Sequence, residues 1–462
     1  MTLWTSLEIA QAVAGEASRD FDANGVAFDS REITSGDLFI ALKGEATDGH
    51  KFLDQTFARG AAGAIVSEPT EHPHVRVADT MDALNALGRA SRARTGAKVI
   101  GVTGSVGKTG TKEALYAALD RGDPGRAHRS VKSYNNHTGV PLSLARMPAD
   151  TQFGVFEMGM NHAGELAALT RLVRPHVALV TTIASAHAEF FRDETEIADA
   201  KGEIFQGLEP GGTAIIPFDS PHRDRLIAAA QPHAGRIVTF GLGEGADVRA
   251  IETMRTLSGG TFITARLDAN AGPGRETSFT LSQPGVHWVS NAMAVIAAVE
   301  AVGGDLELAG LALAELGGIA GRGARFQTRI GAGEALVIDE SYNANPASMR
   351  ATLAVLGHEN AARKLAVLGE MRELGDHSEA FHAELSGPIE AAGVNYAILV
   401  GPGMASLANA LEGRVDFVHV PDAATARDRL RAVLTPGDAV LIKGSNGVGL
   451  ATLVAALAEA KA

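Results

Sequence analysis

The chain has 462 residues, of which 45% are hydrophobic, and it carries a formal net charge of −13 and no cysteine. The acidic balance, without a basic block, argues against nucleic acid or an anionic membrane surface as the main partner. The lack of cysteine excludes disulfides and thiol catalysis and fits a reducing cytoplasm, where we expect the protein to act. The length predicts about three domains.

The sequence predicts neither a targeting signal nor a membrane span. The first residues, MTLWTSLEIA, lack the basic region and the long apolar core of a signal peptide. The most apolar window, 292–316, is interrupted by Glu300, Asp305, Glu307 and Glu315. We therefore interpret this window as a buried helix and its surroundings.

Residues 1–80 predict a small α/β domain in which short strands alternate with helices. The predicted strands lie near Phe28 and over 37–42, 64–66 and 75–77. A helix over 81–94 is expected to lead into the second domain.

Residues 81–321 predict a central domain with a mostly parallel sheet. Strands alternate with helices here, which is typical of a sheet covered by helices on both faces. The predicted parallel strands lie over 98–102, 153–157, 177–183 and 213–217. Three further β-rich pieces, near 248–254, 261–267 and 277–281, predict an antiparallel appendage, and a helix over 288–302 closes the domain.

Residues 322–462 predict a second doubly wound unit of the Rossmann type. The glycine-rich segment GIAGRGARF, 318–326, predicts a hinge before it. The predicted strands lie near 336–338, 365–368, 397–400, 417–420 and 439–442. The expected fold class is therefore α/β, with domains at 1–80, 81–321 and 322–462.

The stretch GVTGSVGKTGTKEAL, 101–115, predicts a phosphate-binding loop between a strand and a helix. Gly104 and Gly107 would let backbone N–H groups surround phosphate oxygens at a helix N-terminus, which favours anions. Lys108 would reach the β- and γ-phosphates, and the Thr109 hydroxyl would bind Mg²⁺. The loop has the compact form G-x-x-G-K-T, so a plain strand-to-helix turn is the alternative.

Three polar features follow predicted strands, at the edge where open α/β sheets bind ligands. Glu157 could hold Mg²⁺ beside the phosphate loop, or it could cap a helix. His187 lies past another strand, although a lone histidine is more often structural. The amide-rich loop 133–144 could hold a phosphate or carboxylate, or form an ordinary turn. The glycine runs 241–247 and 400–404 lack the full dinucleotide-binding pattern, and we interpret both as turns.

Taken in order, these residues resemble the Mur ligase family over the whole chain, in three blocks. The first block is DSREITSGDLFIALKGEATDGHKFLDQTFARGA, 29–61, the second surrounds the G-x-x-G-K-T loop, and the third begins at the hinge. The most specific motifs are YNANP, 342–346, and GEMRELG, 369–375. These two separate the branch that adds D-alanyl-D-alanine from its relatives.

The resemblance assigns roles to individual residues. Ser30 and Arg31 match residues that hold the UDP-sugar end, with the pattern completed by Lys43, Gly44, Asp48, Gly49 and His50. The nucleotide set comprises Gly104, Ser105, Val106, Gly107, Lys108 and Thr109 in the loop, Asn291 at the adenine, Arg322 at the hinge, Asp339 at the ribose, and Tyr342, Asn343 and Asn345 on the adenine side. Glu157 and His187 match Mg²⁺ ligands. Asn135, Asn136 and Thr138 match the loop beside the γ-phosphate and the reacting carboxylate.

The resemblance also assigns Lys443 and Ser445 to substrate binding. Asn446 departs from the family, because many members carry arginine after the Lys-Gly-Ser sequence. This departure bears on the contacts around Lys443 and Ser445 only.

Lys201 matches a lysine that several members of the family carry as a carbamate, and its own surroundings are unusual. If 199–208 is helical, the residues three and four positions away are all apolar: Ile197, Ala198, Ile204 and Phe205. Such a lysine either extends to water or turns inward. An inward ammonium would repel Mg²⁺, whereas a carbamate reverses the charge and offers two oxygens to a hard cation. Our hypothesis is a carbamylated Lys201 that acts with Lys108, Glu157 and His187, and with Thr109 as a further metal ligand.

The function that the resemblance implies is ATP-dependent, ADP-forming ligation of D-alanyl-D-alanine to UDP-N-acetylmuramoyl-tripeptide through an acyl phosphate, in peptidoglycan precursor synthesis. It implies ATP and two Mg²⁺ ions, no nucleic acid, and a monomer. The enzymatic alternatives are a sister Mur ligase of the MurE type and folylpolyglutamate synthase, and YNANP with GEMRELG argues against both. The non-enzymatic alternative is a nucleotide-gated switch, against which the 29–61 block argues.

Overall fold

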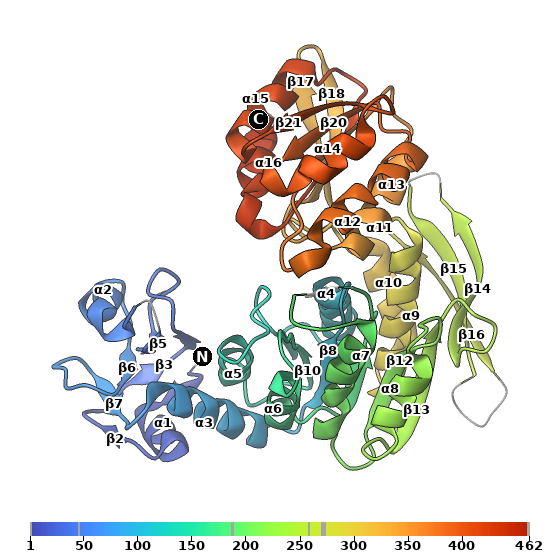
Figure 1. Cartoon of the computed structure of the whole chain (residues 1–462). Coiled ribbons are helices and arrows are strands. Elements are labelled where there is room, and N and C mark those ends of the chain that lie inside the picture. The colour runs from blue at the N-terminus through green and yellow to red at the C-terminus, as the bar shows by residue number, and fades with distance from the viewer. Residues whose placement is uncertain (1, 45–46, 186–188, 257–258, 269–273, 460–462) are drawn as a thin grey trace.

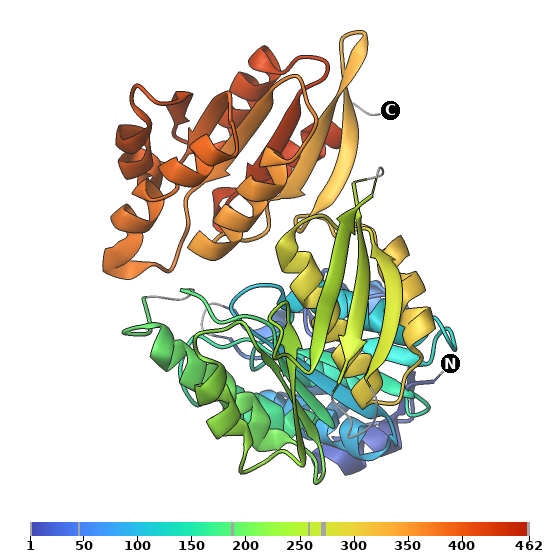
Figure 2. The ribbon, with the colours of Figure 1, turned by 90° about the vertical axis from the view of Figure 1, so that its right-hand side faces the viewer.

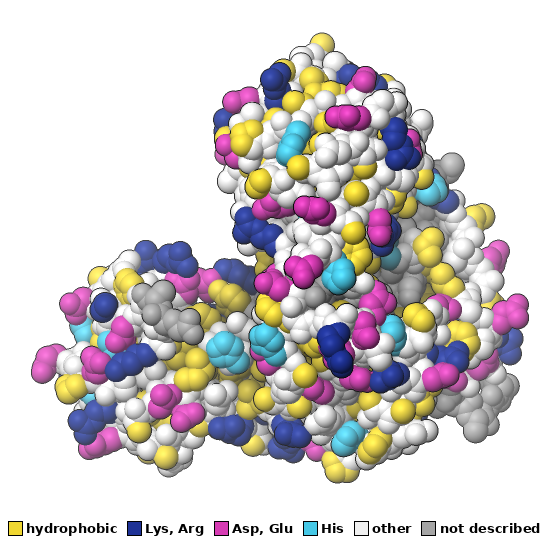
Figure 3. Space-filling model, viewed as in Figure 1, with side chains coloured by type: hydrophobic (Ala, Val, Ile, Leu, Met, Phe, Trp, Pro, Cys, Tyr) yellow, Lys and Arg dark blue, Asp and Glu magenta, His cyan; other side chains and the backbone are white. Residues whose placement is uncertain are grey.

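The computed structural model describes residues 2–44, 47–185, 189–256, 259–268 and 274–459. The chain forms successive lobes, the first beside the second and the last above it (Figure 1). On the face that Figure 3 shows, acidic and basic side chains are interspersed, and a notch separates the first lobe from the last. Within the described ranges, no helix has the length and apolar character needed to cross a membrane.

The first lobe is a small sheet with the strand order β2-β7-β6-β5-β4, parallel except for β2. Leu38 and Ile40 of β5 pack towards one core, and Phe39 packs towards another, as the twofold period of a strand requires. The elements are β1 (Trp4–Thr5), α1 (Ser6–Val13), β2 (Glu16–Ala17), β3 (Asp22–Ala23), β4 (Gly25–Ala27), β5 (Asp37–Ile40), α2 (Leu53–Ala58), β6 (Gly63–Val66), β7 (His74–Arg76) and α3 (Thr80–Ala93). The predicted strands are present, but Phe28 lies just outside β4, and the two-residue strands β1, β2 and β3 are too short to show a period.

The second lobe is built on a sheet with the order β16-β15-β14-β13-β12-β11-β8-β10-β9. Its strands are β8 (Lys98–Thr103), β9 (Ala127–Arg129), β10 (Phe153–Glu157), β11 (Val177–Val180), β12 (Thr213–Pro217), β13 (Arg236–Gly241), β14 (Val248–Arg255), β15 (Thr261–Leu267) and β16 (Arg275–Leu281). Its helices are α4 (Lys108–Asp120), α5 (Gly139–Ala145), α6 (Glu165–Val173), α7 (Glu194–Gly202), α8 (Arg223–Ala230), α9 (Val286–Ala301) and α10 (Leu306–Glu315).

Alternate residues of the central strands bury themselves under helices on opposite faces of this sheet. Ile100 and Val102 of β8 pack with α4, α9 and α10, whereas Val99 packs with the layer of α5 to α8. Leu179 and Ala178 of β11 divide in the same way. The predicted sheet with helices on both faces is therefore confirmed.

The predicted antiparallel appendage is not separate from the central sheet. β14, β15 and β16 are antiparallel to one another, but β14 also pairs in parallel with β13. Figure 2 shows these strands continuing the sheet. Asp247 fixes the turn before β14, because its carboxylate accepts hydrogen bonds from the Thr239 amide (2.7 Å) and hydroxyl (2.6 Å). The residues of β14 itself do not encode which neighbour it joins.

The last lobe has the strand order β17-β18-β22-β19-β20-β21, with β17 the antiparallel edge. Its strands are β17 (Ala324–Ile330), β18 (Gly333–Glu340), β19 (Lys364–Gly369), β20 (Tyr396–Val400), β21 (Asp416–Val420) and β22 (Ala439–Lys443). Its helices are α11 (Pro346–Gly357), α12 (Ser378–Ala383), α13 (Ser386–Ala391), α14 (Ala405–Leu411), α15 (Ala423–Val433) and α16 (Leu450–Glu459). β17 begins at Ala324, inside the predicted hinge 318–326. The segment that joins the second lobe to the first strand of the last lobe is therefore shorter than expected.

The first lobe is held firmly against the second. The indole N–H of Trp4 donates to the Ala145 carbonyl (2.8 Å), and the Arg94 guanidinium lies 3.5 Å from the centre of the Trp4 ring. The Glu32 carboxylate accepts a hydrogen bond from the Tyr134 hydroxyl (2.7 Å) and pairs with Lys132. These contacts fix the predicted UDP-binding segment relative to the loop that follows β9.

His128 makes the stability of the second lobe depend on pH. Its Nε2 donates to the Ser143 carbonyl (2.8 Å), and its ring lies 5.8 Å from that of Phe156. Burial lowers the pKa of His128 to about 4, although the bond to Ser143 opposes this. The unfolded chain therefore binds the extra proton at a higher pH than the folded chain. The contribution of the neutral His128 ring to the free energy of unfolding is complete above about pH 6.5 and is lost as the pH falls towards 4.

We predict that His128→Gln, which keeps a donor for Ser143, flattens this pH dependence. Urea unfolding at several pH values between 4.5 and 7 would give the free energy of unfolding at each pH. In the variant, this free energy should rise with pH less steeply than in the wild type, by up to about 1.4 kcal/mol per pH unit. Equal slopes in the two proteins would contradict the assignment.

Candidate active site

The predicted phosphate loop lies between β8 and α4, in the strand–loop–helix order expected. Gly104 has φ +147°, and a Cβ there would lie 1.9 Å from the Thr181 hydroxyl. Gly107 has φ +90° and precedes the first residue of α4. Both positions therefore require glycine, and the loop leaves the N-terminal N–H groups of α4 available for an anion.

Glu157 is a buried carboxylate at the end of β10, with 1% of its surface exposed. One oxygen accepts a hydrogen bond from the Thr109 hydroxyl (2.8 Å), and the other accepts one from the Asn135 amide (2.8 Å). The structure thus brings together three predicted site residues from three separate segments. Carboxylate, hydroxyl and amide oxygens are the ligands that a hard divalent cation prefers, so this set fits Mg²⁺.

Two lysines lie one helical turn apart at the start of α4. Lys108 donates to the Gly104 carbonyl (2.7 Å), and burial lowers its pKa although Glu157 opposes the shift. Lys112, which the sequence reasoning missed, is completely buried. It donates to the carbonyls of Ser130 (2.9 Å) and Lys132 (2.5 Å), and its Nζ lies 3.9 Å from Glu157. The spacing of four residues from Lys108 was the available signal, because it places both side chains on one face of the helix.

The amide-rich loop makes two kinds of contact, one with the buried carboxylate and one within its own turn. Asn135 reaches Glu157, whereas the Asn136 side chain accepts hydrogen bonds from the amide and hydroxyl of Thr138 and from the Gly139 amide. Asn136 and Thr138 therefore close a turn before α5, which was the alternative interpretation for this loop. Their predicted contact with phosphate or carboxylate stays a prediction.

Lys201 turns inward from α7 and has 1% of its surface exposed. The interpretation in which this side chain extends to water is therefore excluded. Burial is the main cause that moves its pKa well below the ordinary value, and the charge of Lys108 adds to the shift. The helix ends at Gly202 and continues as the 3₁₀ segment η2 (Glu203–Gly207), so 199–208 is not one regular helix. His187 lies outside the described residues.

A cavity of about 260 Å³ lies between the second and last lobes and collects most of the predicted nucleotide residues. From the second lobe it is lined by Ser105, Val106, Gly107, Lys108, Asn135, Glu157 and Asn291. From the last lobe and the hinge it is lined by Arg322, Tyr342, Asn343, Asn345 and Lys443. Lys443 is held in place by a hydrogen bond from its Nζ to the Asn343 carbonyl (2.8 Å).

The hinge is organised around Arg322 and Asp339. The Arg322 guanidinium lies 4.3 Å from the centre of the Tyr342 ring and donates to the Ser133 hydroxyl (3.1 Å). Asp339 is buried, and its carboxylate accepts hydrogen bonds from the Gly321 amide (2.7 Å) and the Ser341 hydroxyl (2.6 Å). Asp339 therefore braces the hinge, and its role at the ribose stays a prediction.

Trp288, His287 and Glu340 are among the residues of the cavity that the sequence did not predict. Trp288 and His287 come from the start of α9, and Glu340 ends β18. Burial lowers the pKa of His287 to about 4, and it raises the pKa of Glu340. Trp288 could have been found from its helical spacing to Asn291, which puts both on one face.

The first-lobe residues do not line this cavity, and Figure 1 shows the first lobe beside the second lobe and away from the last one. Ser30 is buried, whereas the Arg31 side chain is 82% exposed and pairs with Asp29 at 2.7 Å. This pair lowers the pKa of Asp29 to about 2. Because its side chain is exposed, Arg31 can meet a ligand without first leaving a buried position.

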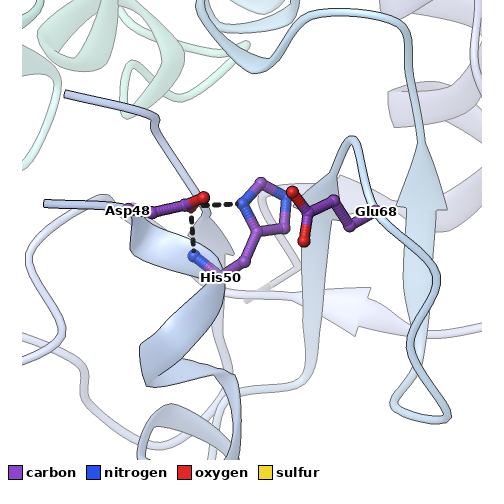
Figure 4. Close-up of side chains that lie close together, drawn as sticks. All are labelled: Asp48, His50 and Glu68. Atoms are coloured by element: carbon purple, nitrogen blue, oxygen red, sulfur yellow. Dashed lines mark hydrogen bonds and ion pairs between the residues drawn. The ribbon is translucent and has the colours of Figure 1, made fainter. Parts of the chain in front are cut away.

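Asp48, His50 and Glu68 lie close together and hold the backbone and side chains near Lys43 and Gly44 in place (Figure 4). His50 Nδ1 lies 2.6 Å from Asp48, and its Nε2 accepts a hydrogen bond from the Ser67 amide (2.9 Å). Both ring nitrogens are thus engaged. Glu68 pairs with Lys43 at 2.8 Å. Gly49 allows this close packing, because a Cβ there would lie 2.8 Å from the Leu42 nitrogen.

The comparisons with family models cover most of the chain. The model of the Mur ligase family, catalytic domain, matches residues 22–95, that of the Mur ligase middle domain matches 102–299, and that of the Mur ligase, glutamate ligase domain, matches 324–446.

Full-length relatives agree with these models. The UDP-N-acetylmuramoyl-tripeptide–D-alanyl-D-alanine ligase of Synechocystis sp. is 35% identical over 98% of this chain and 96% of its own length. The ligase of the same name from Escherichia coli is 34% identical over 95% of each chain. The structure of MurF from Acinetobacter baumannii superposes with a TM-score of 0.84 at 33% identity, over 99% of each chain. The structure of MurF from Thermotoga maritima in complex with ADP superposes with a TM-score of 0.77 at 26% identity, over 94% of this chain and 97% of that one. The chain belongs to the Mur ligase family.

Proposed function

We propose that this protein is an ATP-dependent, ADP-forming ligase that joins D-alanyl-D-alanine to UDP-N-acetylmuramoyl-tripeptide in peptidoglycan precursor synthesis. The observation that carries the proposal is the cavity in which the phosphate loop, the buried Glu157 and the YNANP segment meet. The full-length similarity to ligases named for this reaction supports the choice of substrates.

The reaction has two steps. The terminal carboxylate of the tripeptide attacks the γ-phosphorus of ATP, the bond from that phosphorus to ADP breaks, and an acyl phosphate forms. The amine of D-alanyl-D-alanine then attacks the acyl carbon and loses a proton, inorganic phosphate leaves, and an amide remains. The first step joins two anions, so positive charge placed at the phosphate lowers its barrier.

Lys108 supplies that charge from the chain itself. Its Nζ now bonds to the Gly104 carbonyl, at the loop that would surround the phosphates. Thr109, Glu157, Lys201 and His187 would hold Mg²⁺, with Asn135 orienting the Glu157 carboxylate. Bound Mg²⁺ would supply further positive charge to the phosphate oxygens.

A carbamate on Lys201 fits the burial of this side chain. A neutral amine adds to carbon dioxide, forming an N–C bond and releasing one proton. Burial lowers the pKa of Lys201 and so raises the fraction of the reactive, neutral amine. The resulting carbamate would add a negative charge that the neutral amine lacks, and this charge would attract Mg²⁺.

Each lobe has a separate role in the proposed reaction. We assign 1–80 to the UDP-sugar, 81–321 to ATP and 322–462 to closing over the nucleotide, and we place a monomeric enzyme in the cytoplasm. Gly321 and Gly323 adopt positive φ at the hinge, which suits a movement of the last lobe. Closure would exclude water, which otherwise hydrolyses an acyl phosphate.

Sister ligases are the alternative within the family. A MurE-type ligase and a folylpolyglutamate synthase share the fold at 19% and 17% identity, which carries no argument on substrate. A ligation assay that compares D-alanyl-D-alanine with single amino acids as the amine donor would decide. ATP turnover without either acceptor would instead favour a nucleotide-gated switch.

Lys108→Ala should lower kcat by a factor that corresponds to about 2–4 kcal/mol in the barrier, because it removes a charge aimed at the transferred phosphoryl group. Lys98→Ala, at the exposed start of β8, is the matched control and should leave turnover unchanged. Near-normal phosphate release by Lys108→Ala would overturn the ATP-site assignment.

Arg31→Ala should raise the KM for the UDP-tripeptide about tenfold or more and leave the KM for ATP unchanged, because the exposed Arg31 side chain belongs to the first lobe and does not line the nucleotide cavity. Arg89→Ala, on the exposed face of α3, controls for the loss of one surface charge. If both KM values rise together in Arg31→Ala, the substitution acts through folding and the assignment fails.

Lys201→Ala should bind ATP almost normally but fail to form the acyl phosphate. Binding is measured by calorimetry, and the carbamate by NMR of protein equilibrated with isotopically labelled bicarbonate. We expect a carbamate signal in the wild type that disappears in Lys201→Ala. A wild type without this signal, together with a fully active variant, would refute the hypothesis.

A further inference from the structure

The ammonium group of Lys112 is completely buried and has a contact for each of its three hydrogens. Its Nζ donates to the carbonyls of Ser130 (2.9 Å) and Lys132 (2.5 Å), and it lies 3.1 Å from the Glu113 carboxylate. An ammonium has three donors and no acceptor, so these contacts can use all of them. Lys112 does not line the nucleotide cavity. Its partners are therefore parts of the protein, and we look for its role in what it holds.

The backbone that Lys112 holds is in an unusual conformation. Lys132 has φ +54°, which lies in the left-handed region that residues other than glycine seldom adopt. Such a conformation persists where surrounding contacts hold it. The hydrogen bond from Lys112 to the Lys132 carbonyl is one such contact, and the ion pair of Lys132 with Glu32 is another. Lys112 thus fixes the turn that the chain makes after β9.

The segment 130–135, which contains this turn, reaches three other parts of the molecule. Its side chains contact the buried carboxylate, the hinge and the first lobe: Asn135 with Glu157 (2.8 Å), Ser133 with Arg322 (3.1 Å) and Tyr134 with Glu32 (2.7 Å). A shift of the segment would therefore be felt at each of these places.

We propose that Lys112 is a positioning residue of the ligase. By holding the carbonyls of residues 130 and 132, it sets where the Asn135 amide meets the Glu157 carboxylate. The kinetic part of this inference rests on the proposed function, whereas the structural part stands without it.

Helix α4 then controls both oxygens of the Glu157 carboxylate. The Thr109 hydroxyl, in the first turn of the helix, donates directly to Oε2 (2.8 Å). Lys112, three residues later, holds the segment from which Asn135 donates to Oε1. The same helix begins at the phosphate loop. A carboxylate held in this way keeps a fixed orientation relative to a nucleotide on that loop, as in-line transfer of a phosphoryl group requires.

The distances favour this role over that of a counter-charge for Glu157. The Lys112 Nζ lies 3.9 Å from the carboxylate, which is beyond hydrogen-bond distance, whereas both carbonyls lie within it. The two roles also differ in their consequences. A counter-charge would act on Glu157 whatever Asn135 does, whereas a positioning residue acts through Asn135.

Lys112→Met removes the donors and nearly keeps the length of the side chain. In the unliganded protein, hydrogen–deuterium exchange followed by mass spectrometry should show the amides of 131–135 exchanging about tenfold faster or more than in the wild type. The amides of β8, in the core of the same lobe, should keep their wild-type rates. Unchanged exchange at 131–135 would overturn the proposal, and so would faster exchange throughout the lobe, because that result indicates a general loss of stability.

Lys364→Met is the matched control, because Lys364 also donates to a backbone carbonyl, that of Gly357. Lys364 is the first residue of β19, whereas the nucleotide cavity lies at the carboxyl ends of the neighbouring parallel strands. This variant should leave both the exchange of 131–135 and the rate of ligation unchanged.

A double-mutant cycle tests whether Lys112 acts through Asn135. Lys112→Met should lower kcat by about ten- to a hundredfold and change the KM for ATP by less than about twofold. Asn135→Ala should also lower kcat. In the double variant, kcat should stay close to that of the slower single variant, because both substitutions remove the same contact with Glu157. Factors that multiply in the double variant would show that Lys112 acts independently of Asn135, which would overturn the proposal.

Lys112→Gln keeps N–H donors without the charge and is one atom shorter. It should fall between the wild type and Lys112→Met in the exchange of 131–135 and in kcat. A glutamine variant as impaired as the methionine variant in both measurements would assign the effect to the charge and contradict the proposal. If the wild type does not ligate D-alanyl-D-alanine, the proposed function fails, whereas the exchange measurements still decide whether Lys112 holds the segment.

Discussion

The burial of the Glu157 carboxylate is the constraint on which the rest of this molecule depends. A buried charge is tolerated only if hydrogen bonds and opposite charges satisfy it. Thr109 and Asn135 supply the hydrogen bonds, and Lys112 lies 3.9 Å away. Lys112 in turn holds the backbone of the segment that carries Asn135. The same segment contacts the first lobe through Lys132 and Tyr134, and the hinge through Ser133. One carboxylate thus joins a network that touches every lobe.

The lobes differ in how firmly they are attached. The first is fixed to the second by aromatic and ionic contacts around Trp4 and Glu32, whereas the last is joined through glycines with positive φ and through individual polar contacts such as that between Arg322 and Ser133. Under the proposed function, the two reactants that must be held in register would lie on the two firmly joined lobes, and the last lobe would close the site. A reaction through a water-sensitive acyl phosphate needs this division.

The sequence was sufficient where local pattern and chemistry coincide. The alternation of strands and helices predicted the sheets, and the spacing of Gly104, Gly107 and Lys108 predicted the strand, loop and helix that carry the proposed phosphate site. It was insufficient where the outcome depends on which distant segment becomes a neighbour. The parallel pairing of β14 with β13, the hinge contacts of Asp339 and the grip of Lys112 on the Lys132 carbonyl all belong to this class. Asn136 and Thr138 show a third case, since a turn and a ligand-binding loop share one composition.

The positions of the two tryptophans give the protein a built-in optical probe. Trp4 and Trp288 are the only tryptophans in the sequence. Trp4 is buried where the first lobe docks and stacks on Arg94, so its surroundings are fixed. Trp288 lines the nucleotide cavity and lies against Gly110 of α4. We therefore expect the indole fluorescence of the unlabelled protein to combine a constant part from Trp4 with a part from Trp288 that changes when the cavity is filled. Replacing Trp4 by phenylalanine would leave the second signal alone.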